Sequence, residues 1–315
     1  MVQTPQITIK SWLMILLLAF VWGGTFLVTE VALTGITPFW LAAARVGFAS
    51  LATGAVWLMQ GRNLFHSPPP ASTYVPLILI GALSGAIPFT LLAWGQQHVT
   101  SGFAGVSMAS TALILLPLAH VFVPGEQITL RRFIGFVIGF AGVVVLIGLQ
   151  AFSSTGEALE TAGRLACVAA ASCYAVSSIL MRRLPPVDPI GLSAVVLIVG
   201  ACISIPAAFL VEGPPPLPAP DILVVLILLG LVPTALANFM RVLVIRSAGP
   251  VFMSLVNYQV PVWSVLLGAV ILDEPLPPTL IVAMALILTG LAVSQFGALK
   301  RLFTGEPGRQ GPVDP

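Results

Sequence analysis

Residues 12–33 read WLMILLLAFVWGGTFLVTEVAL, and Glu30 is the only charged member of this run. A membrane-spanning helix needs about 20 mostly apolar residues, so the run is long enough to cross a bilayer. Similar runs recur along the chain, separated by short stretches rich in proline, glycine and charge. The pattern predicts ten transmembrane helices, near residues 12–33, 38–60, 74–95, 101–123, 132–151, 163–182, 189–211, 222–245, 250–271 and 279–298.

The composition favours an all-α integral membrane protein. Of the 315 residues, 58% are apolar and only 8% are charged, whereas soluble domains carry roughly a quarter charged residues. Such a chain cannot cover itself with polar surface, so lipid is its natural solvent. Little sequence remains for a soluble domain, and any function is therefore expected within the helix bundle.

The basic residues are distributed unevenly between the two faces that ten spans create. If the amino terminus is cytoplasmic, the opposite face receives only Arg164, while Arg45 and Arg241 fall inside spans. Positive charge concentrates on the cytoplasmic side of membrane proteins, so both termini are predicted to be cytoplasmic. The residues on that side are Lys10, Arg62, Arg131, Arg132, Arg182, Arg183, Arg246, Lys300, Arg301 and Arg309.

The two halves of the chain share landmarks at an offset of about 150 residues, as in an internal repeat. Gly85-Ala-Ile-Pro88 matches Gly230-Leu-Val-Pro233, and each sequence lies inside a predicted span. The other matches are Pro38 with Pro189, Trp22 with Tyr174, Thr25 with Ser177, Glu126 with Glu274, and Gly142 with Gly290. These matches predict two five-helix repeats, residues 1–150 and 151–300, followed by a cytoplasmic tail, residues 301–315.

Five spans per repeat is an odd number, so the second repeat starts on the opposite face and has inverted topology. Inverted repeats recur in secondary transporters, in which two related halves rock about a site near the middle of the membrane. Channels can carry such repeats too, and duplication preserved for packing alone is a further alternative.

The ordered landmarks resemble the drug/metabolite transporter superfamily, specifically its EamA-type ten-helix members with two tandem EamA domains. The likeness covers residues 11–298. It rests on Trp22-Gly23-Gly24-Thr25-Phe26, Pro38, Ala42-Ala43-Ala44-Arg45, Gly125-Glu126, Gly135, Gly139, Gly142, Tyr174-Ala175, Arg182-Arg183, Pro261, Leu272-Asp273-Glu274-Pro275 and Gly290.

The resemblance implies a multi-pass protein of the bacterial inner, or cytoplasmic, membrane that exports or exchanges a small metabolite, amino acid or drug-like molecule. It implies a small-molecule substrate and the lipid bilayer as partners, with a coupling proton or a counter-solute as the driving partner. It implies no nucleic acid, no cofactor and no particular oligomeric state. Members often carry lysine where this chain has Glu30, so the charge preference of the site is expected to differ.

Ionisable groups inside a bilayer are costly and mark functional sites. Glu30 near the end of the first span and Arg45 in the second are close enough to the same face to form a pair, either as a gate or as a permanent structural contact. Polar and aromatic residues at helical spacing mark faces that avoid lipid, and such faces line small-molecule sites or only join helices. The predicted cavity residues are Trp22, Thr25, Glu30, Arg45, Trp94, Ser110, Tyr174, Ser177, Asn238, Asn257 and Tyr258.

Pro88, Pro233 and Pro261 are the predicted hinges, because proline inside a helix removes a backbone hydrogen bond and bends the helix. Bends that only improve packing are the alternative reading. Glu126, Asp273 and Glu274 are expected to bind free backbone amides at helix starts.

An integral-membrane enzyme acting on lipid-linked substrates would need clustered His, Asp, Glu or Cys residues. His66, His98 and His120 are instead scattered along the chain, and no catalytic or metal-binding motif is present in the sequence. The chain is therefore not expected to be an enzyme.

Overall fold

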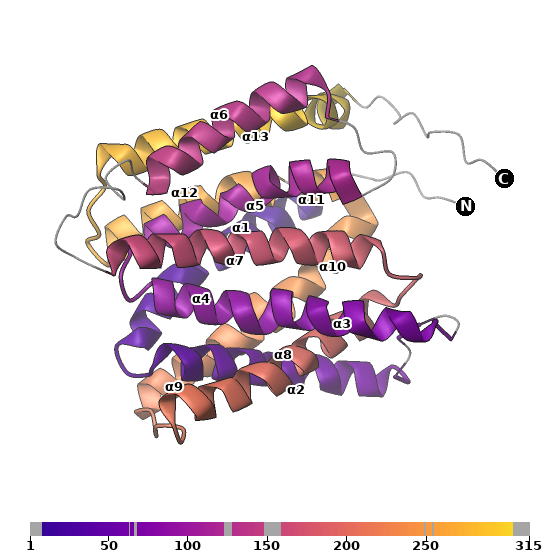
Figure 1. Ribbon diagram of the computed structural model, residues 1–315, viewed down its shortest axis with the longest axis vertical. Coiled ribbons are helices and arrows are strands. Elements are labelled where there is room, and N and C mark those ends of the chain that lie inside the picture. The colour runs from indigo at the N-terminus through magenta and orange to yellow at the C-terminus, as the bar shows by residue number, and fades with distance from the viewer. Residues whose placement is uncertain are drawn as a thin grey trace.

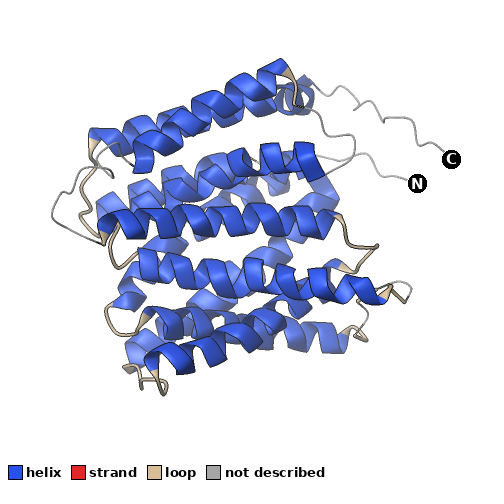
Figure 2. Cartoon of the chain, in the orientation of Figure 1, coloured by secondary structure: helices blue, strands red, loops and turns tan. Residues whose placement is uncertain are grey.

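The computed structural model describes residues 8–62, 64–65, 68–122, 128–147, 159–248, 250–253 and 255–304. Within these ranges the chain is a bundle of helices (Figure 2), with a single isolated β-bridge between Phe65 and Val187. Eight of the helices in the described ranges are long and apolar enough to cross a membrane. The shorter helices α6 and α12 occupy the fifth and ninth predicted positions, so helix is present at all ten.

The helices of the first half are α1 (Ile9–Leu33), α2 (Pro38–Met59), η1 (Ala71–Thr73), α3 (Tyr74–Gly81), η2 (Ala82–Ala86), α4 (Ile87–Gly95), α5 (Ser101–Phe122) and α6 (Leu130–Ile147). Those of the second half are α7 (Glu160–Arg182), α8 (Pro189–Glu212), α9 (Pro220–Leu229), η4 (Gly230–Leu236), α10 (Ala237–Ala248), α11 (Pro250–Met253), α12 (Val256–Ile271) and α13 (Pro278–Thr304). The end of the predicted fifth span, residues 148–151, lies outside the described residues.

The two halves interlock rather than lying side by side as separate bodies. Helix α6 of the first half packs along α13 of the second at one edge of the bundle, and α2 packs along α8 near the other edge (Figure 1). Between them, α5 contacts both α7 and α12. Each long contact therefore joins a helix of one half to a helix of the other.

Glycines allow the closest of these contacts. A Cβ atom added to Gly135 would lie 2.5 Å from the backbone oxygen of Gly290, and one added to Gly290 would lie 2.4 Å from the backbone nitrogen of Gly139. The small-xxx-small pair in α6 thus serves packing within the chain, as such motifs do between membrane helices.

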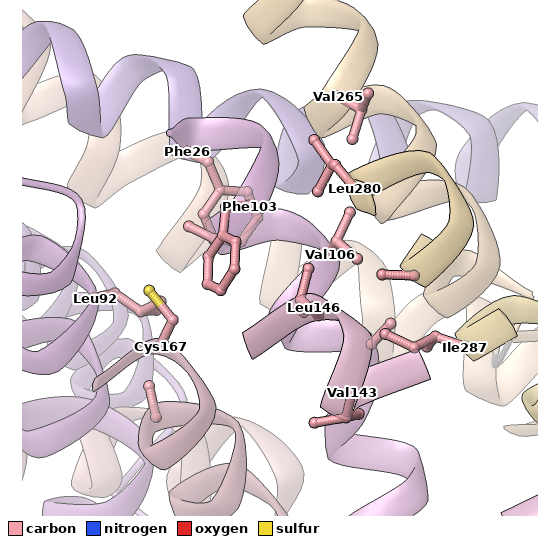
Figure 3. Packing of buried hydrophobic residues seen from close by; sticks show 14 of the residues in the cluster. Phe26, Leu92, Phe103, Val106, Val143, Leu146, Cys167, Val265, Leu280 and Ile287 are labelled. Atoms are coloured by element: carbon pink, nitrogen blue, oxygen red, sulfur yellow. The ribbon is translucent and has the colours of Figure 1, made fainter. Parts of the chain in front are cut away.

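Apolar side chains fill the space between the helices of the two halves. Phe26, Phe103 and Leu146 belong to a cluster drawn from α1, α4, α5, α6, α7, α12 and α13 (Figure 3). A second cluster around Trp40 and Leu226 joins α1, α2, α8 and α9. These cores hold both halves around the middle of the bundle.

The repeated Gly-x-x-Pro sequences lie at π-helical turns, as their predicted role in bends suggests. In the first half, the Ile87 amide bonds to the Ala82 carbonyl five residues back, directly before Pro88. In the second half, the Ala237 amide bonds to the Val232 carbonyl, and Pro233 lies inside the π-helix. A π turn leaves carbonyls of the ladder available to other donors, and such turns are frequent at functional sites.

Candidate functional site

Arg45 lies at the centre of the contacts between the two halves. It is the eighth residue of α2, roughly 10 Å along that helix at 1.5 Å per residue, and its exposed fraction is 6%. Its Nε donates to Thr234 Oγ1 in η4 at 3.0 Å, and its Nη2 lies 3.4 Å from Thr25 Oγ1 in α1. Both acceptors are neutral hydroxyls.

Aromatic rings complete the surroundings of this guanidinium. The Arg45 Cζ lies 4.2 Å from the centroid of the Phe89 ring in α4, which is the geometry of a cation–π contact. The Tyr174 ring in α7 meets the Phe89 ring edge to face, with 6.4 Å between centroids. We call Thr25, Arg45, Phe89, Tyr174 and Thr234 the arginine cluster.

The bend of the eighth span adds polar contacts beside the cluster. The Trp22 indole Nε1 donates to the Pro233 carbonyl at 2.9 Å, which is possible because the Ala237 amide bonds to Val232 instead. Thr234 Oγ1 donates to the Leu229 carbonyl, the group that Pro233 deprives of its usual amide partner. Asn238 Nδ2 donates to the Thr234 carbonyl at 2.6 Å. Trp22, Tyr174 and Asn238 are each partly exposed.

Five of the predicted cavity residues therefore meet at one place: Trp22, Thr25, Arg45, Tyr174 and Asn238. Glu30 is not among them, and the proposed pair with Arg45 does not form. The Glu30 carboxylate instead lies 3.5 Å from Gln96 Nε2, which also donates to the Phe26 carbonyl at 2.8 Å. Helix α1 turns Glu30 toward Gln96, which follows the last residue of α4.

The family follows from comparison with known sequences. The model of the EamA-like transporter family matches residues 9–148 and again residues 161–295. The chain belongs to the EamA-like transporter family. It is 26% identical to protein PecM of Dickeya dadantii over 285 residues, covering 87% of this chain and 89% of that protein.

A second relative and one solved structure are also similar to this EamA-family chain. It is 22% identical to the S-adenosylmethionine/S-adenosylhomocysteine transporter of Chlamydia trachomatis, covering 95% of this chain and 90% of that protein. One solved crystal structure superposes with a TM-score of 0.64 at 23% identity, covering 92% of this chain and 98% of the other. The superposition supports the fold alone, and the name of the Chlamydia trachomatis relative identifies that protein as a small-molecule transporter.

The remaining predicted residues of this EamA-family chain make no hydrogen bond to Arg45 among the described residues. Ser110 and Ser177 are buried, and their hydroxyls donate to the carbonyls of Ser107 and Tyr174 on their own helices. Trp94 packs edge to face on His98, with 5.0 Å between ring centroids. Hydroxyls bound within their own helix are poor candidates for substrate contact.

The ninth span contributes less definite candidates. Asn257 is exposed on α12, Pro261 is buried in the same helix, and the Tyr258 hydroxyl is buried without a hydrogen-bond partner among the described residues. Arg241 is exposed on α10. The structure does not bring these residues into hydrogen-bond contact with the arginine cluster.

Sequence reasoning missed Phe89 and Thr234. Each directly follows the proline of its Gly-x-x-Pro sequence, so the repeat itself gave the signal. Thr234 is a small hydroxyl and Phe89 is an apolar ring, and neither residue type stands out in a membrane span. Their shared position after Pro88 and Pro233 could have singled them out.

Carboxylates of the transporter tie helices together at one end of the bundle, which we call the Leu33 end. Glu274 accepts hydrogen bonds from the Ser101 and Gly102 amides at 2.8 and 3.1 Å, at the start of α5. Glu212 accepts from the Phe39 and Trp40 amides at 3.1 Å each, at the start of α2. The role expected for Glu274 is confirmed, although the helix it caps belongs to the other half.

Asp273 is exposed with a φ of 53°, and Glu126 lies outside the described residues. Within the described ranges, no three His, Cys, Asp or Glu side chains lie close enough together to bind a metal ion. An apolar groove lined by Trp40, Phe48 and Leu226 lies between α2, α8 and α9, on the surface expected to face lipid. The arginine cluster is thus the site that combines charge, hydroxyls and aromatic rings.

Proposed function

We propose that this protein is a secondary transporter that carries a small solute across the cytoplasmic membrane, in the export direction, by alternating access. The observation that supports the proposal most strongly is the arginine cluster. Its residues come from α1, α2, α4, α7 and η4, so both halves build it. A site shared by two inverted halves changes its accessibility when one half moves against the other.

The contacts at the Leu33 end would act as the closed gate of this cycle. Glu274 joins the start of α5 to the loop after α12, Glu212 joins α8 to α2, and Gln96 joins α4 to α1. Opening that end requires these hydrogen bonds to exchange partners. The excess of basic residues on the opposite side supports an outside location for the Leu33 end and cytoplasmic termini.

The two π-helical turns are where the third and eighth spans would change their bend. Both turns lie close to the arginine cluster, because Phe89 is the third residue after the first turn and Thr234 belongs to the second. A change in π register would move the residues that hold Arg45. Solute binding at the arginine cluster and bending of the two spans would then be coupled directly, because the same residues take part in both.

Counterflow in proteoliposomes tests this function. Vesicles containing the purified protein are loaded with an unlabelled metabolite mixture, and uptake of the same labelled solutes is followed. A carrier exchanges solute for solute, so uptake should rise when solute is present inside. An uptake rate that is the same with and without solute inside the vesicles would indicate a channel. Absence of flux for every solute, from protein that is folded, would contradict the transport function and favour the alternative of a membrane enzyme.

The driving partner is tested in the same vesicles. A proton gradient and a counter-solute gradient are imposed separately, and the initial rate of uptake is measured under each. A coupled carrier should concentrate its solute under one of them. Equal rates with and without both gradients would leave uniport as the mode of transport.

A further inference from the structure

The charge of Arg45 is buried without an acidic partner. Nε and Nη2 reach only the hydroxyls of Thr234 and Thr25, and within the described residues Nη1 has no hydrogen-bond acceptor. The acidic side chains of the described residues lie elsewhere: Glu30, Glu160, Asp188, Glu212, Asp221, Asp273 and Glu274. Five of them have partners of their own, which are Gln96, Arg164, the Thr37 hydroxyl and amides at helix starts.

A cation in the middle of a membrane bundle is costly unless it is paired. A neutral hydroxyl and the face of a phenyl ring each stabilise it only in part. The arginine cluster therefore supplies a positive charge, a planar set of N–H donors and no resident anion to satisfy them.

The repeat shows that this charge is not required by the fold. The offset of 151 residues between Pro38 and Pro189 pairs Arg45 with Val196 on α8. The two positions pack alike, because the Val196 backbone oxygen faces Gly85 and the Arg45 backbone oxygen faces Gly230. Valine thus fills the same structural role in the second half.

Arg45 also bridges the two bends. Phe89 and Thr234, its main contacts, are equivalent residues after Pro88 and Pro233. An anion bound to this guanidinium would sit where both bent spans meet. Partly exposed Trp22 and Tyr174 beside it would contact the rest of a small organic solute.

We propose that Arg45 binds the anionic group of the transported solute, and that the substrates are small organic anions with a carboxylate or similar oxyanion. The planar guanidinium matches such groups with two parallel hydrogen bonds. The described residues of the cluster offer no carboxylate for an ammonium group, so cationic solutes are disfavoured. This assignment rests on the transport function proposed above.

The test uses a bacterial metabolite extract separated by ion exchange into anionic, neutral and cationic fractions. Each fraction is loaded into proteoliposomes of the full-length protein, and solutes that leave are identified by mass spectrometry against protein-free vesicles. Efflux should be confined to the anionic fraction. Arg45→Gln should reduce that efflux about tenfold or more, as expected for loss of a charged hydrogen-bonding partner. Arg183→Gln removes an exposed charge from the end of α7 and should leave it unchanged.

Arg45→Lys keeps the charge but loses the planar fork, so it should still select anions while requiring a several-fold higher solute concentration. If Arg45→Gln does not fold, the solute concentration that Arg45→Lys requires for half-maximal efflux becomes the test of the anion assignment. Efflux of neutral or cationic solutes alone, or anion efflux that Arg45→Gln leaves intact, would overturn the anion assignment and leave the carrier function standing. Absence of efflux from every fraction would remove both.

Discussion

The bends of the third and eighth spans are built from the same Gly-x-x-Pro sequence and differ in what they do. In the third span the π-helix ends before Pro88, and Gly85 packs against Gly200 of α8. In the eighth span the π-helix encloses Pro233, and its carbonyl groups bind Trp22 and Thr234 while Thr234 holds Arg45. Both bends pack a glycine against a helix of the other half, but only the second bend also supplies hydrogen-bonding groups to the site. The repeated sequence supplies both bends, and the side chains around each bend give it a different role.

The largest effect is expected from filling the glycine contacts. A Cβ at Gly230 would lie 2.6 Å from Phe48 Cβ and 2.9 Å from the Arg45 backbone oxygen, whereas one at Gly85 would lie 3.3 Å from Gly200 Cα. Gly230→Ala should therefore lower the free energy of unfolding by about 3 kcal/mol, and Gly85→Ala by about 1 kcal/mol. Apparent melting temperatures in detergent measure the difference. Gly47→Ala is the control, since nothing lies within 4 Å of its added Cβ. Equal losses at Gly85 and Gly230 would contradict the comparison.

The residues after the two prolines provide the next test. Thr234→Val leaves Arg45 Nε and the Leu229 carbonyl without their hydroxyl partner, so it should cost about 2 kcal/mol of stability. Phe89→Leu removes the cation–π contact with Arg45 and the edge-to-face contact with Tyr174, and it should cost about 1 kcal/mol beyond the change in packing. Thr234→Ser keeps the hydroxyl and is the matched control. If Thr234→Val melts like Thr234→Ser, the hydroxyl does not hold Arg45 in the way described.

Trp22 and Tyr174 occupy matching positions in α1 and α7, yet only Trp22 reaches a carbonyl of a bend. Trp22→Phe should cost about 1 kcal/mol through the lost hydrogen bond to Pro233. Tyr174→Phe keeps the ring that faces Phe89, so its melting temperature should stay closer to that of the native chain. The two variants are compared in one thermal melt series. A larger loss for Tyr174→Phe would show that the first bend, and not the second, depends on these aromatic residues.

The smallest effect on stability is expected at the Leu33 end. Glu30→Gln keeps the size of the side chain and can keep its contact with Gln96, so it should change the free energy of unfolding by less than about 1 kcal/mol. The variant should flatten the pH dependence of solute uptake while leaving the melting temperature nearly unchanged. Uptake is measured at intervals between about pH 5 and about pH 8. Glu160→Gln, which loses only the surface pair with Arg164, is the control. An unchanged pH profile in Glu30→Gln would exclude Glu30 from coupling.

The fold could be predicted from sequence because its determinants are local and periodic. Apolar runs, flanking prolines and the offset between Gly85-Pro88 and Gly230-Pro233 were enough to place ten helices and two repeats. Helix ends were predicted to within a few residues, except that α13 continues to Thr304 because Lys300 and Arg301 extend it beyond the apolar run.

The site was predicted only in part because partner choice depends on how helices rotate about their axes. Glu30 and Arg45 share a membrane face by sequence, but α1 directs Glu30 to Gln96 and α2 directs Arg45 to Thr234. Such rotation is set by packing between distant segments, such as Gly230 against Phe48. Charge and spacing alone carry no information about it.

The pairing of Arg45 with Val196 has a kinetic consequence. A solute held by its anionic end at Arg45 meets the two halves in one fixed orientation, so it leads with a different end when it arrives from each side of the membrane. The half-saturation constants and maximal rates on the two sides would then be unequal. When no gradient is present, the Haldane relation still requires the ratio of maximal rate to half-saturation constant to be equal on the two sides. The asymmetry therefore sets the rate of transport in each direction and does not change the solute distribution at equilibrium.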